Sequence, residues 1–561
     1  MKSLLQFQRC LGRALAVAAT LFLSHGPVPP ASAADLIVST LADSGPGSLR
    51  DQILASAPGD AIRFSVAGNI VLGSPLVLGK PLAVLGPGPG KLIISANHLN
   101  RAFLAGGGAI LLAGLTIRDG FVEGAAGVDG LLTENGTPGD TAMGGGIWHT
   151  SGELILSNCW FAENSVVGGR GGRGGDSCLV GVCYLPPGQG GAGGMARGAA
   201  VYSTDRVKAI NCTFSENICQ GGRGGAGGNN QNWFAGGAGG NGGWAMGGGL
   251  NVNASTYCVF TNCTFSRNVG RGGQGGNGGT GGGYAGGLAG GGGLGSCGGL
   301  AFYGGQICSG TIVSNFAIGG LGGAGGAGTP PGTDGAMGSG QGGGVCTYLM
   351  FCGLGLANTL IADDGASESS PTAMANITDH GYNYLGDNEG VLSCGWASTT
   401  RIGTIGARLH PLLGPLALNG AGLPTHLPLP GSPVLDKGYS FGLAKDERGA
   451  PRPVDDPGVP NAAGGDGTDI GAAEAGGVVG VAGITWNRPP AGPPLVQLQV
   501  LTEAGWSYRI EFSESLPSGP ANWHALLENL VGTGEAMPVF DQTPASASRF
   551  YRVLQLRPPG Q

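Results

Sequence analysis

The chain has 561 residues, of which 120 are glycine, while charged residues make up 11% and aromatic residues 6%. This glycine content is far above ordinary usage, but a hydrophobic fraction of 41% is too high for a uniformly disordered protein. The formal net charge of −7 and the lack of basic clusters argue against nucleic acid and anionic membranes as partners.

The N-terminus has the features of a secretory signal. Lys2, Arg9 and Arg13 precede or flank an apolar run over residues 14–23, and small residues at 31–33 suit a signal peptidase. Residues 1–33 are therefore predicted to be a signal peptide, and the mature protein is expected to be secreted or displayed on a cell surface. No later stretch is long and apolar enough to predict an integral membrane segment after signal removal.

The next segment predicts a cap and the first coils of a repetitive β-fold. Ser48 followed by Asp51 is typical of a helix N-terminus, and Leu49, Ile53 and Leu54 predict a short amphipathic helix that covers the open end of a β-stack. Short aliphatic blocks separated by glycine and proline then predict strands. These blocks are residues 70–72, 76–78, 82–85, 92–94 and 115–117.

Three copies of the pattern Asn-Cys-x-Phe-x-x-Asn follow, beginning at Asn158, Asn211 and Asn262. One coil cannot bury its own apolar side chains, so the repeat predicts a parallel β-helix whose coils stack about 4.8 Å apart. Equivalent residues should then form ladders, with cysteine and phenylalanine inside and asparagine at the turns. The predicted ladder residues, which this assignment makes structural, are Asn158, Cys159, Phe161, Asn164, Asn211, Cys212, Phe214, Asn217, Asn262, Cys263, Phe265 and Asn268.

Glycine-rich inserts separate the repeats, and several of them have a period of three residues. This period matches a polyproline II helix, so the inserts could pack side by side with every third residue projecting, or they could be flexible loops. Their aromatic residues could contact glycans by stacking, or they could pin the inserts to the coils. These candidates for glycan contact are Trp233, Phe234, Trp244 and Tyr284.

The chain has 13 cysteines, and 12 remain once Cys10 leaves with the signal peptide. Disulfides or buried thiols are expected in an oxidising compartment, and the closest pairs are Cys178/Cys183 and Cys346/Cys352. Metal binding by cysteine is not expected, because Cys-x-x-Cys pairs are missing.

Composition changes near residue 430. The β-helix with its cap and inserts is predicted over residues 34–430, and a closing segment rich in Asp, Pro and Gly over residues 431–476. Alternating polar and apolar residues over 483–556 predict a small C-terminal β-sandwich-like module. The predicted fold class is therefore all-β.

Few acidic residues could carry chemistry. Glu163 and Glu216 occupy equivalent repeat positions, but the third copy has Arg267 there, which favours an exposed turn. His380 beside Asp379 lacks an activated nucleophile and is also interpreted as a turn.

A second acidic group lies in the closing segment. It could form an ion-paired knot, or it could hold calcium at Asp466 and Asp469, although the full alternating pattern of a calcium loop is missing. Its members are Asp436, Asp446, Asp455, Asp456, Asp466, Asp469 and Glu474, with Arg448 and Arg452 among them. The sequence assigns no catalytic residue and no cofactor.

Several segments carry a family resemblance. Residues 41–51, with 58–60 and Phe64, resemble the start of bacterial secreted pectin-lyase-like β-helix surface proteins, and the repeats are also similar to those of polymorphic outer-membrane proteins. Residues 381–387 and parts of 432–474 resemble a choice-of-anchor Q domain. The final module is similar to C-terminal β-modules of secreted verrucomicrobial-type proteins. The resemblance implies a right-handed parallel β-helix with glycine-rich loop inserts.

The expected function is a structural or adhesive role, with extracellular polysaccharide or the cell envelope as partner. The alternative is a polysaccharide lyase or glycoside hydrolase, which would present calcium ligands or paired carboxylates. A more distant alternative is ice binding, for which a regular threonine face is hinted at by Thr213, Thr264 and Thr311.

Overall fold

The computed structural model describes residues 35–177, 185–231, 233–347, 353–366, 373–393, 395–420, 422–476, 480–487, 495–502, 506–514, 523–533, 535–541 and 549–556. The predicted signal peptide lies outside these residues. The chain divides between His410 and Pro411 into two compact units.

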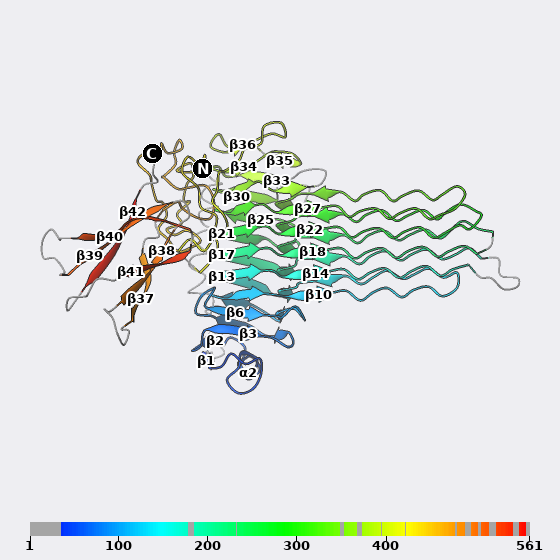
Figure 1. Ribbon diagram of the computed structural model, residues 1–561, viewed down its shortest axis with the longest axis horizontal. Helices are drawn as coiled ribbons and strands as arrows, with labels where there is room; N and C mark the ends of the chain where they lie inside the picture. The colour runs from blue at the N-terminus through cyan, green and yellow to red at the C-terminus, as the bar shows by residue number, and fades with distance from the viewer. Residues whose placement is uncertain are drawn as a thin grey trace, which may run out of the picture. The chain divides into compact units, whose positions relative to one another are not determined.

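The first unit is a parallel β-helix, as predicted (Figure 1). Its longest strands, β13 (Glu153–Ala162), β17 (Arg206–Ser215) and β21 (Cys258–Ser266), pair in parallel register. In the coils before β13 and after β21, two shorter strands with a corner between them take the place of one long strand. The first of these columns is β1 (Asp35–Val38), β2 (Ala61–Phe64), β5 (Leu82–Leu85), β8 (Ile110–Ala113), β25 (Gly305–Cys308), β30 (Leu354–Ala357), β33 (Ala373–Asp379) and β35 (Val391–Ser393).

The second column continues the same sheet past the corner. Its short strands are β3 (Gly68–Val71), β6 (Leu92–Ser95), β9 (Thr116–Arg118), β26 (Thr311–Val313), β31 (Leu360–Ala362), β34 (Tyr384–Leu385) and β36 (Arg401–Ile402). A third column leads into β33 and consists of β4 (Leu76–Leu78), β7 (Phe103–Ala105), β12 (Ile147–His149), β16 (Val201–Ser203), β20 (Leu250–Val252), β24 (Leu300–Phe302) and β29 (Val345–Thr347).

Two further parallel sheets of very short strands flank the glycine-rich inserts. One consists of β10 (Phe121–Glu123), β14 (Ser165–Val167), β18 (Ile218–Gln220), β22 (Val269–Arg271), β27 (Phe316–Ile318) and β32 (Gly365–Ala366). The other consists of β11 (Ala142–Met143), β15 (Ala196–Arg197), β19 (Ala245–Met246), β23 (Gly295–Ser296) and β28 (Gly340–Gln341).

The predicted cap helix is α2 (Leu49–Ala55). The Ser48 side chain accepts a hydrogen bond from the Asp51 backbone N–H, which satisfies one of the free donors of the first turn. Leu49 and Ile53 are buried, as an amphipathic helix requires. Leu54 does not belong to that face, because its side chain is 76% exposed.

The repeat residues form the core ladders. The Phe161 ring stacks on Phe214 with a centroid distance of 4.9 Å, and Phe214 stacks on Phe265 at 4.6 Å. Cys159, Cys212 and Cys263 pair in register and are buried free thiols. Burial raises the pKa of the Cys159 and Cys212 thiols well above the ordinary value, so they behave as apolar groups.

The two asparagines of each repeat have different structural roles. Asn158, Asn211 and Asn262 have φ near +50° and form the corner within each long strand, a conformation that asparagine tolerates. The second asparagine is buried and bonds along the stack. Asn164 Nδ2 donates to Asn217 Oδ1 at 2.9 Å, and Asn217 Nδ2 donates to Asn268 Oδ1 at 2.8 Å.

The threonine row that suggested an ice-binding face is part of the interior. Thr213, Thr264 and Thr311 pair in register, but all three are buried. They cannot form a regular exposed surface, so this hint at ice binding is wrong.

The described disulfide joins Cys297 to Cys346 on successive coils. The predicted pairing of Cys346 with Cys352 is therefore wrong, because stacking brings residues one coil apart closer than the local chain does. Cys178, Cys183 and Cys352 lie outside the described residues.

In the second unit, residues 411–430 pair with one another through bridges between Leu413 and Pro428 and between Ala417 and Thr425. The coil stack ends at β36, whereas the sequence predicted a β-helix up to residue 430. None of the described helices has the length and hydropathy needed to span a membrane.

The C-terminal module is built from two three-stranded antiparallel sheets, which confirms the predicted β-module. Apolar residues of both sheets, including Val496, Leu498, Tyr508 and Ile510, share one buried core. The sheets are β37 (Gly480–Asn487), β38 (Leu495–Leu501) and β41 (Ala536–Asp541), and β40 (His524–Val531), β39 (Ser507–Ser513) and β42 (Phe550–Leu556).

Candidate functional site

Glycine-rich inserts extend from the β-helix as a stack of long hairpins (Figure 1). Each insert begins after a strand of the β10 sheet and returns to a strand of the β11 sheet. We call these inserts together the glycine array, with an outgoing layer and a returning layer. The inserts are residues 124–141, 168–195, 221–244, 272–294 and 319–339.

Backbone hydrogen bonds hold the array together in two directions. Within the outgoing layer, the Gly171 N–H donates to the Arg223 carbonyl on the next coil at 2.8 Å. Between layers, the Gly172 N–H donates to the Thr137 carbonyl at 2.9 Å. Two of the three residues in each triplet thus use their N–H groups, and the described residues of the inserts form an ordered lattice. Flexible loops are the wrong interpretation.

The close packing explains why two residues of each triplet are glycine. A Cβ at Gly225 would lie 1.9 Å from the Gly172 carbonyl oxygen, and one at Gly224 would lie 2.0 Å from the Gly240 oxygen. With three residues per turn, the third residue always points to the same outer side. Each layer therefore presents a flat outer face of side chains.

The outermost arms break the glycine pattern where a neighbouring arm is missing. Ala125 and Val128 of the first insert stand where the next insert has Gly169 and Gly172, glycines that face the preceding arm. In the last insert, Asp334 stands at a glycine-type position, and its Oδ1 accepts the Gly325 N–H at 2.7 Å. These side chains fill positions that no further arm occupies.

The four aromatic candidates do not form one site. Trp233 and Tyr284 lie at the ends of adjacent hairpins, with ring centroids 6.1 Å apart in an edge-on arrangement. They are 69% and 37% exposed, so Trp233 does not pin an insert to the coils. Phe234, next to Trp233, is half-buried. Trp244 lies at the other end of its arm, directly before β19, and is 47% exposed.

The paired glutamates on the coils are turn residues. Glu163 and Glu216 follow strands in register, and both have φ in the left-handed region. Glu163 pairs with Arg118 at 2.8 Å, and Glu216 pairs with Arg267 at 3.1 Å. Each carboxylate is thus neutralised by an arginine on an adjacent coil, and the pair lacks the free acid and base of a hydrolase.

Asp379 is likewise a turn residue. Its Oδ1 accepts hydrogen bonds from Gly381 N–H, Asn383 Nδ2 and Thr400 Oγ1, and its Oδ2 accepts from Ala397 N–H. Burial lowers the pKa of the adjacent His380. The carboxylate therefore organises the backbone and is not available to orient a base.

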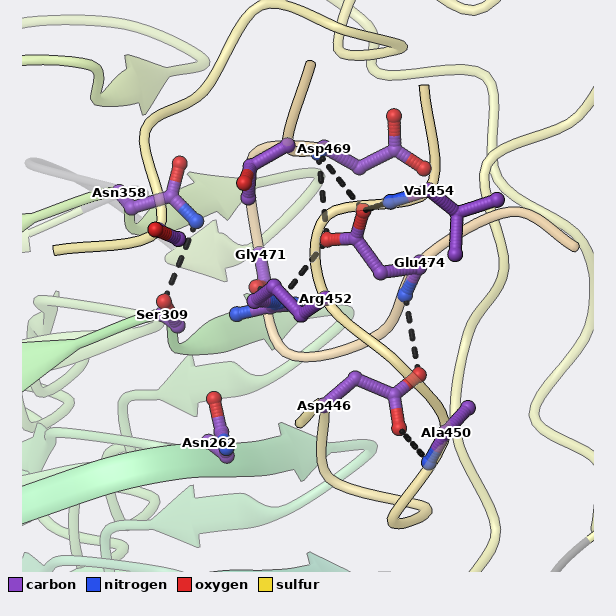
Figure 2. Close-up of polar contacts among 12 residues, drawn as sticks. Asn262, Ser309, Asn358, Asp446, Ala450, Arg452, Val454, Asp469, Gly471 and Glu474 are labelled. Carbon is purple, nitrogen blue, oxygen red and sulfur yellow. Dashed lines mark hydrogen bonds and ion pairs between the residues drawn. The ribbon is translucent and has the colours of Figure 1, made fainter. Parts of the chain in front are cut away.

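The closing segment contains a buried cluster of carboxyl and guanidinium groups (Figure 2). Arg448 bonds to Asp446 at 2.8 Å, and Arg452 Nε lies 2.8 Å from Glu474 Oε1, with all four side chains fully buried. Glu474 also accepts hydrogen bonds from the Val454 and Asp469 N–H groups. The cluster ties together chain segments that have little regular secondary structure.

Acids outnumber guanidinium groups in this cluster. Burial raises the pKa of Glu474 to about 7, against the lowering effect of Arg452. Burial and the nearby Glu474 also raise the pKa of Asp469 well above its ordinary value. Burial therefore favours the protonated form of the carboxyl groups in this cluster.

The two calcium candidates do not form a metal site. Asp466 accepts the Ser440 N–H at 3.0 Å, while Asp469 accepts the N–H groups of Asp436 and Ala475. Their oxygens therefore face hydrogen-bond donors. Within the described ranges, no three His, Cys, Asp or Glu side chains converge as metal ligands.

Comparison with known proteins adds little. No family model matches the chain. No curated protein matches it. Among solved structures, a PL6 family alginate lyase, AlyGC, matches 70% of this chain and 55% of its own length, with 11% sequence identity and a TM-score of 0.15. A match this weak carries no inference about activity.

Proposed function

We propose that the protein is a secreted or cell-surface β-helix scaffold with an adhesive role, and that the glycine array contacts extracellular glycans at its distal end. One observation carries this proposal. A hydrogen-bonded array holds Trp233 and Tyr284 side by side at adjacent hairpin ends, with Trp233 largely exposed.

Preorganisation of the aromatic pair supports this proposal. Aromatic faces bind sugar rings through apolar contact, and an aromatic pair held by a rigid backbone loses little entropy on binding. An exposed tryptophan on a flexible loop would have no such advantage. The array supplies rigidity, because its two layers are joined by backbone hydrogen bonds along their length.

Secretion and surface attachment belong to the same proposal. The signal-like residues 1–33 and the likeness of the closing segment to a choice-of-anchor Q domain support an extracellular location. A buried disulfide is also compatible with an oxidising compartment, because Cys297 and Cys346 pair inside the stack.

The alternative is an enzyme that cleaves extracellular polysaccharide. The coil acids singled out by the sequence are engaged in ion pairs or turns, which supports the adhesive role over this alternative. The enzymatic alternative predicts unsaturated or shortened products from acidic polysaccharides, and for a calcium-dependent lyase these products should disappear with chelator.

The test compares W233A/Y284A with W244A, which removes an exposed tryptophan from the opposite end of an arm. Binding to an oligosaccharide array and to soluble polysaccharides is measured for the wild type and both variants. We expect the double variant to lose at least about tenfold in affinity, in line with one or two stacking contacts, and W244A to retain wild-type binding. Equal binding by both variants would refute the role of the hairpin ends, and turnover of any polymer would favour the enzyme.

A further inference from the structure

The outer face of the outgoing layer has a regular arrangement that the sequence did not reveal. Strand register aligns Gln220 with Arg271, and hydrogen bonds of the array align Arg170, Arg223 and Gln274 in the adjacent column. Along an arm, successive outward residues are about 9 Å apart, because the rise is about 3.1 Å per residue. Between coils the spacing is about 4.8 Å.

The middle of this face is cationic, while the exposed acid Glu123 lies at the far end of the column that contains Arg271. Arg170 pairs with Asp129 only at 3.4 Å, with both side chains well exposed, and Arg173 pairs with Asp176. For Arg223 and Arg271, the described residues supply no acidic partner within ion-pair distance. The guanidinium groups of Arg223 and Arg271 are therefore available to an anionic ligand, although the net charge of the chain is negative.

The returning layer provides a neutral counterpart on the same array. Its outward positions carry small, amide or aliphatic side chains in two aligned columns. The columns are Gln189, Ala238, Leu288 and Thr333, and Ala192, Asn241, Gly291 and Ala336. The charge is therefore a property of one face and not of the array as a whole.

An open groove of about 520 Å³ lies beside Arg223 at the last arms. Arg223, Gln274 and Asn277 contribute charged and amide groups to its lining, while Leu321 and Met337 contribute apolar surface. Asp334 also lines it and brings a negative charge opposite in sign to Arg223, and its Oδ1 accepts the Gly325 N–H. Cationic, amide and apolar groups together suit an extended chain that carries hydroxyl and carboxylate groups.

We propose that this face binds an acidic polysaccharide, with Arg223 and Arg271 pairing to its carboxylates and Gln274 and Asn277 bonding to its hydroxyl groups. The proposal rests on the glycan-binding function above and names the class of glycan. Guanidinium groups bind carboxylates through paired N–H donors, which favours uronate units. A nucleic acid fits less well, because the groove residues include no aromatic ring for base stacking.

The test uses two polymers with one backbone, polygalacturonate and its methyl-esterified form. The full chain and the variants R223Q/R271Q and R63Q/R206Q are compared. The second variant is a matched control, because Arg63 and Arg206 are about half exposed on coil strands. We expect R223Q/R271Q to bind polygalacturonate about tenfold more weakly, as for the loss of two exposed ion pairs, and the control to bind normally.

Binding of the esterified polymer should be unchanged in R223Q/R271Q, and raising salt from low to high ionic strength should weaken only polygalacturonate binding. Thermal unfolding of each variant checks the fold. Equal loss in both arginine variants, or no preference for the acidic polymer, would overturn the acidic-polysaccharide proposal while leaving glycan binding at the hairpin ends intact. Arginine-dependent binding that W233A/Y284A leaves unchanged would instead contradict the role of the hairpin ends. Binding of neither polymer counts against both proposals.

Discussion

Asn315 donates two hydrogen bonds to a single oxygen of Asp364, from its backbone N–H at 2.7 Å and from its Nδ2 at 2.9 Å. Asp364 is the end of a directional ladder, because each buried asparagine from Asn164 onward donates to the side chain on the next coil. A carboxyl group can end such a ladder, since its Oδ1 needs only to accept. Asp364 Oδ2, by contrast, is buried with no hydrogen-bond partner among the described residues.

The first prediction concerns the protonation of Asp364. Burial raises its pKa well above the ordinary value, against the lowering effect of the Asn315 bonds. An acid whose pKa is higher in the folded state stabilises the fold fully below its unfolded pKa, about 3.9, and loses that stabilisation as the pH rises toward the folded pKa. The variant D364N, a neutral isostere, should therefore lose this part of the pH dependence.

Thermal unfolding between pH 4 and pH 8 measures the effect. We expect wild-type and D364N midpoints to agree near pH 4, and D364N to be the more stable protein at pH 8. D363N is the control, because Asp363 is partly exposed and pairs with exposed His410. A D364N protein that is strongly destabilised at pH 8 would show that the Asn315 bonds require an ionised carboxylate.

The second prediction concerns the packing of the glycine array. G225A places a Cβ 1.9 Å from the Gly172 carbonyl oxygen, which only separation of the arms can relieve. G283A is the matched control, since its Cβ would meet nothing within 4 Å. We expect G225A to cost about 2 kcal/mol or more of local stability, seen as faster hydrogen exchange in residues 221–244 and the neighbouring arms. Exchange in β17 and β21 should not change, and equally fast array exchange in G283A would contradict the packing argument.

The repeat motif allowed the coil stack to be predicted, because its residues report burial and turn geometry directly. Phe214 and Cys212 mark the interior, and a left-handed Asn211 marks the corner. Pairings one coil apart were harder to predict. Cys346 has a cysteine six residues away in sequence, yet it bonds to Cys297. The register of β24 and β29 places Cys346 beside Ala301, and the chain just before β24 brings Cys297 into the same buried cluster, which the sequence alone does not show.

The candidate site was predicted only in part, for a related reason. The period of three indicated that every third residue projects, but it did not tell which projecting residues share a face. That depends on how the arms align, for example Arg223 beside Gln274. The aromatic residues were visible in the sequence. The pairing of Trp233 with Tyr284, however, depends on how adjacent hairpins align, and Trp244 lies apart because it directly precedes β19.

The third prediction concerns the buried ion pair of Arg452 and Glu474. With a pKa raised to about 7, Glu474 stabilises the closing segment most below the unfolded value of about 4.3, and this contribution is lost as the pH rises to 7. R452M removes the cation that opposes this loss. We expect it to cost about 3–5 kcal/mol above pH 7, where a buried carboxylate would remain unpaired, and less at pH 5, where Glu474 can be protonated.

Hydrogen exchange of residues 434–476 at both pH values reports this cost directly. R408M is the control, because the Arg408 side chain is 45% exposed where it meets Asp387. A loss of equal size at pH 5 and pH 8 would indicate that Arg452 acts through packing and its bond to the Gly471 carbonyl, and not through its charge.

The fourth prediction concerns the disulfide between Cys297 and Cys346. It closes a loop with a sequence separation of 49 residues, and restricting such a loop in the unfolded chain contributes up to about 4 kcal/mol. C297S/C346S should therefore lower the unfolding midpoint.

Because both sulfur-bearing residues are buried, reductant should leave the native bond intact, and alkylation of these two positions should require reductant and denaturant together. Peptide mass spectrometry measures this, and the buried thiols Cys159 and Cys212 serve as internal controls, since denaturant alone should expose them to alkylation. Labelling of Cys297 by denaturant alone would contradict the pairing.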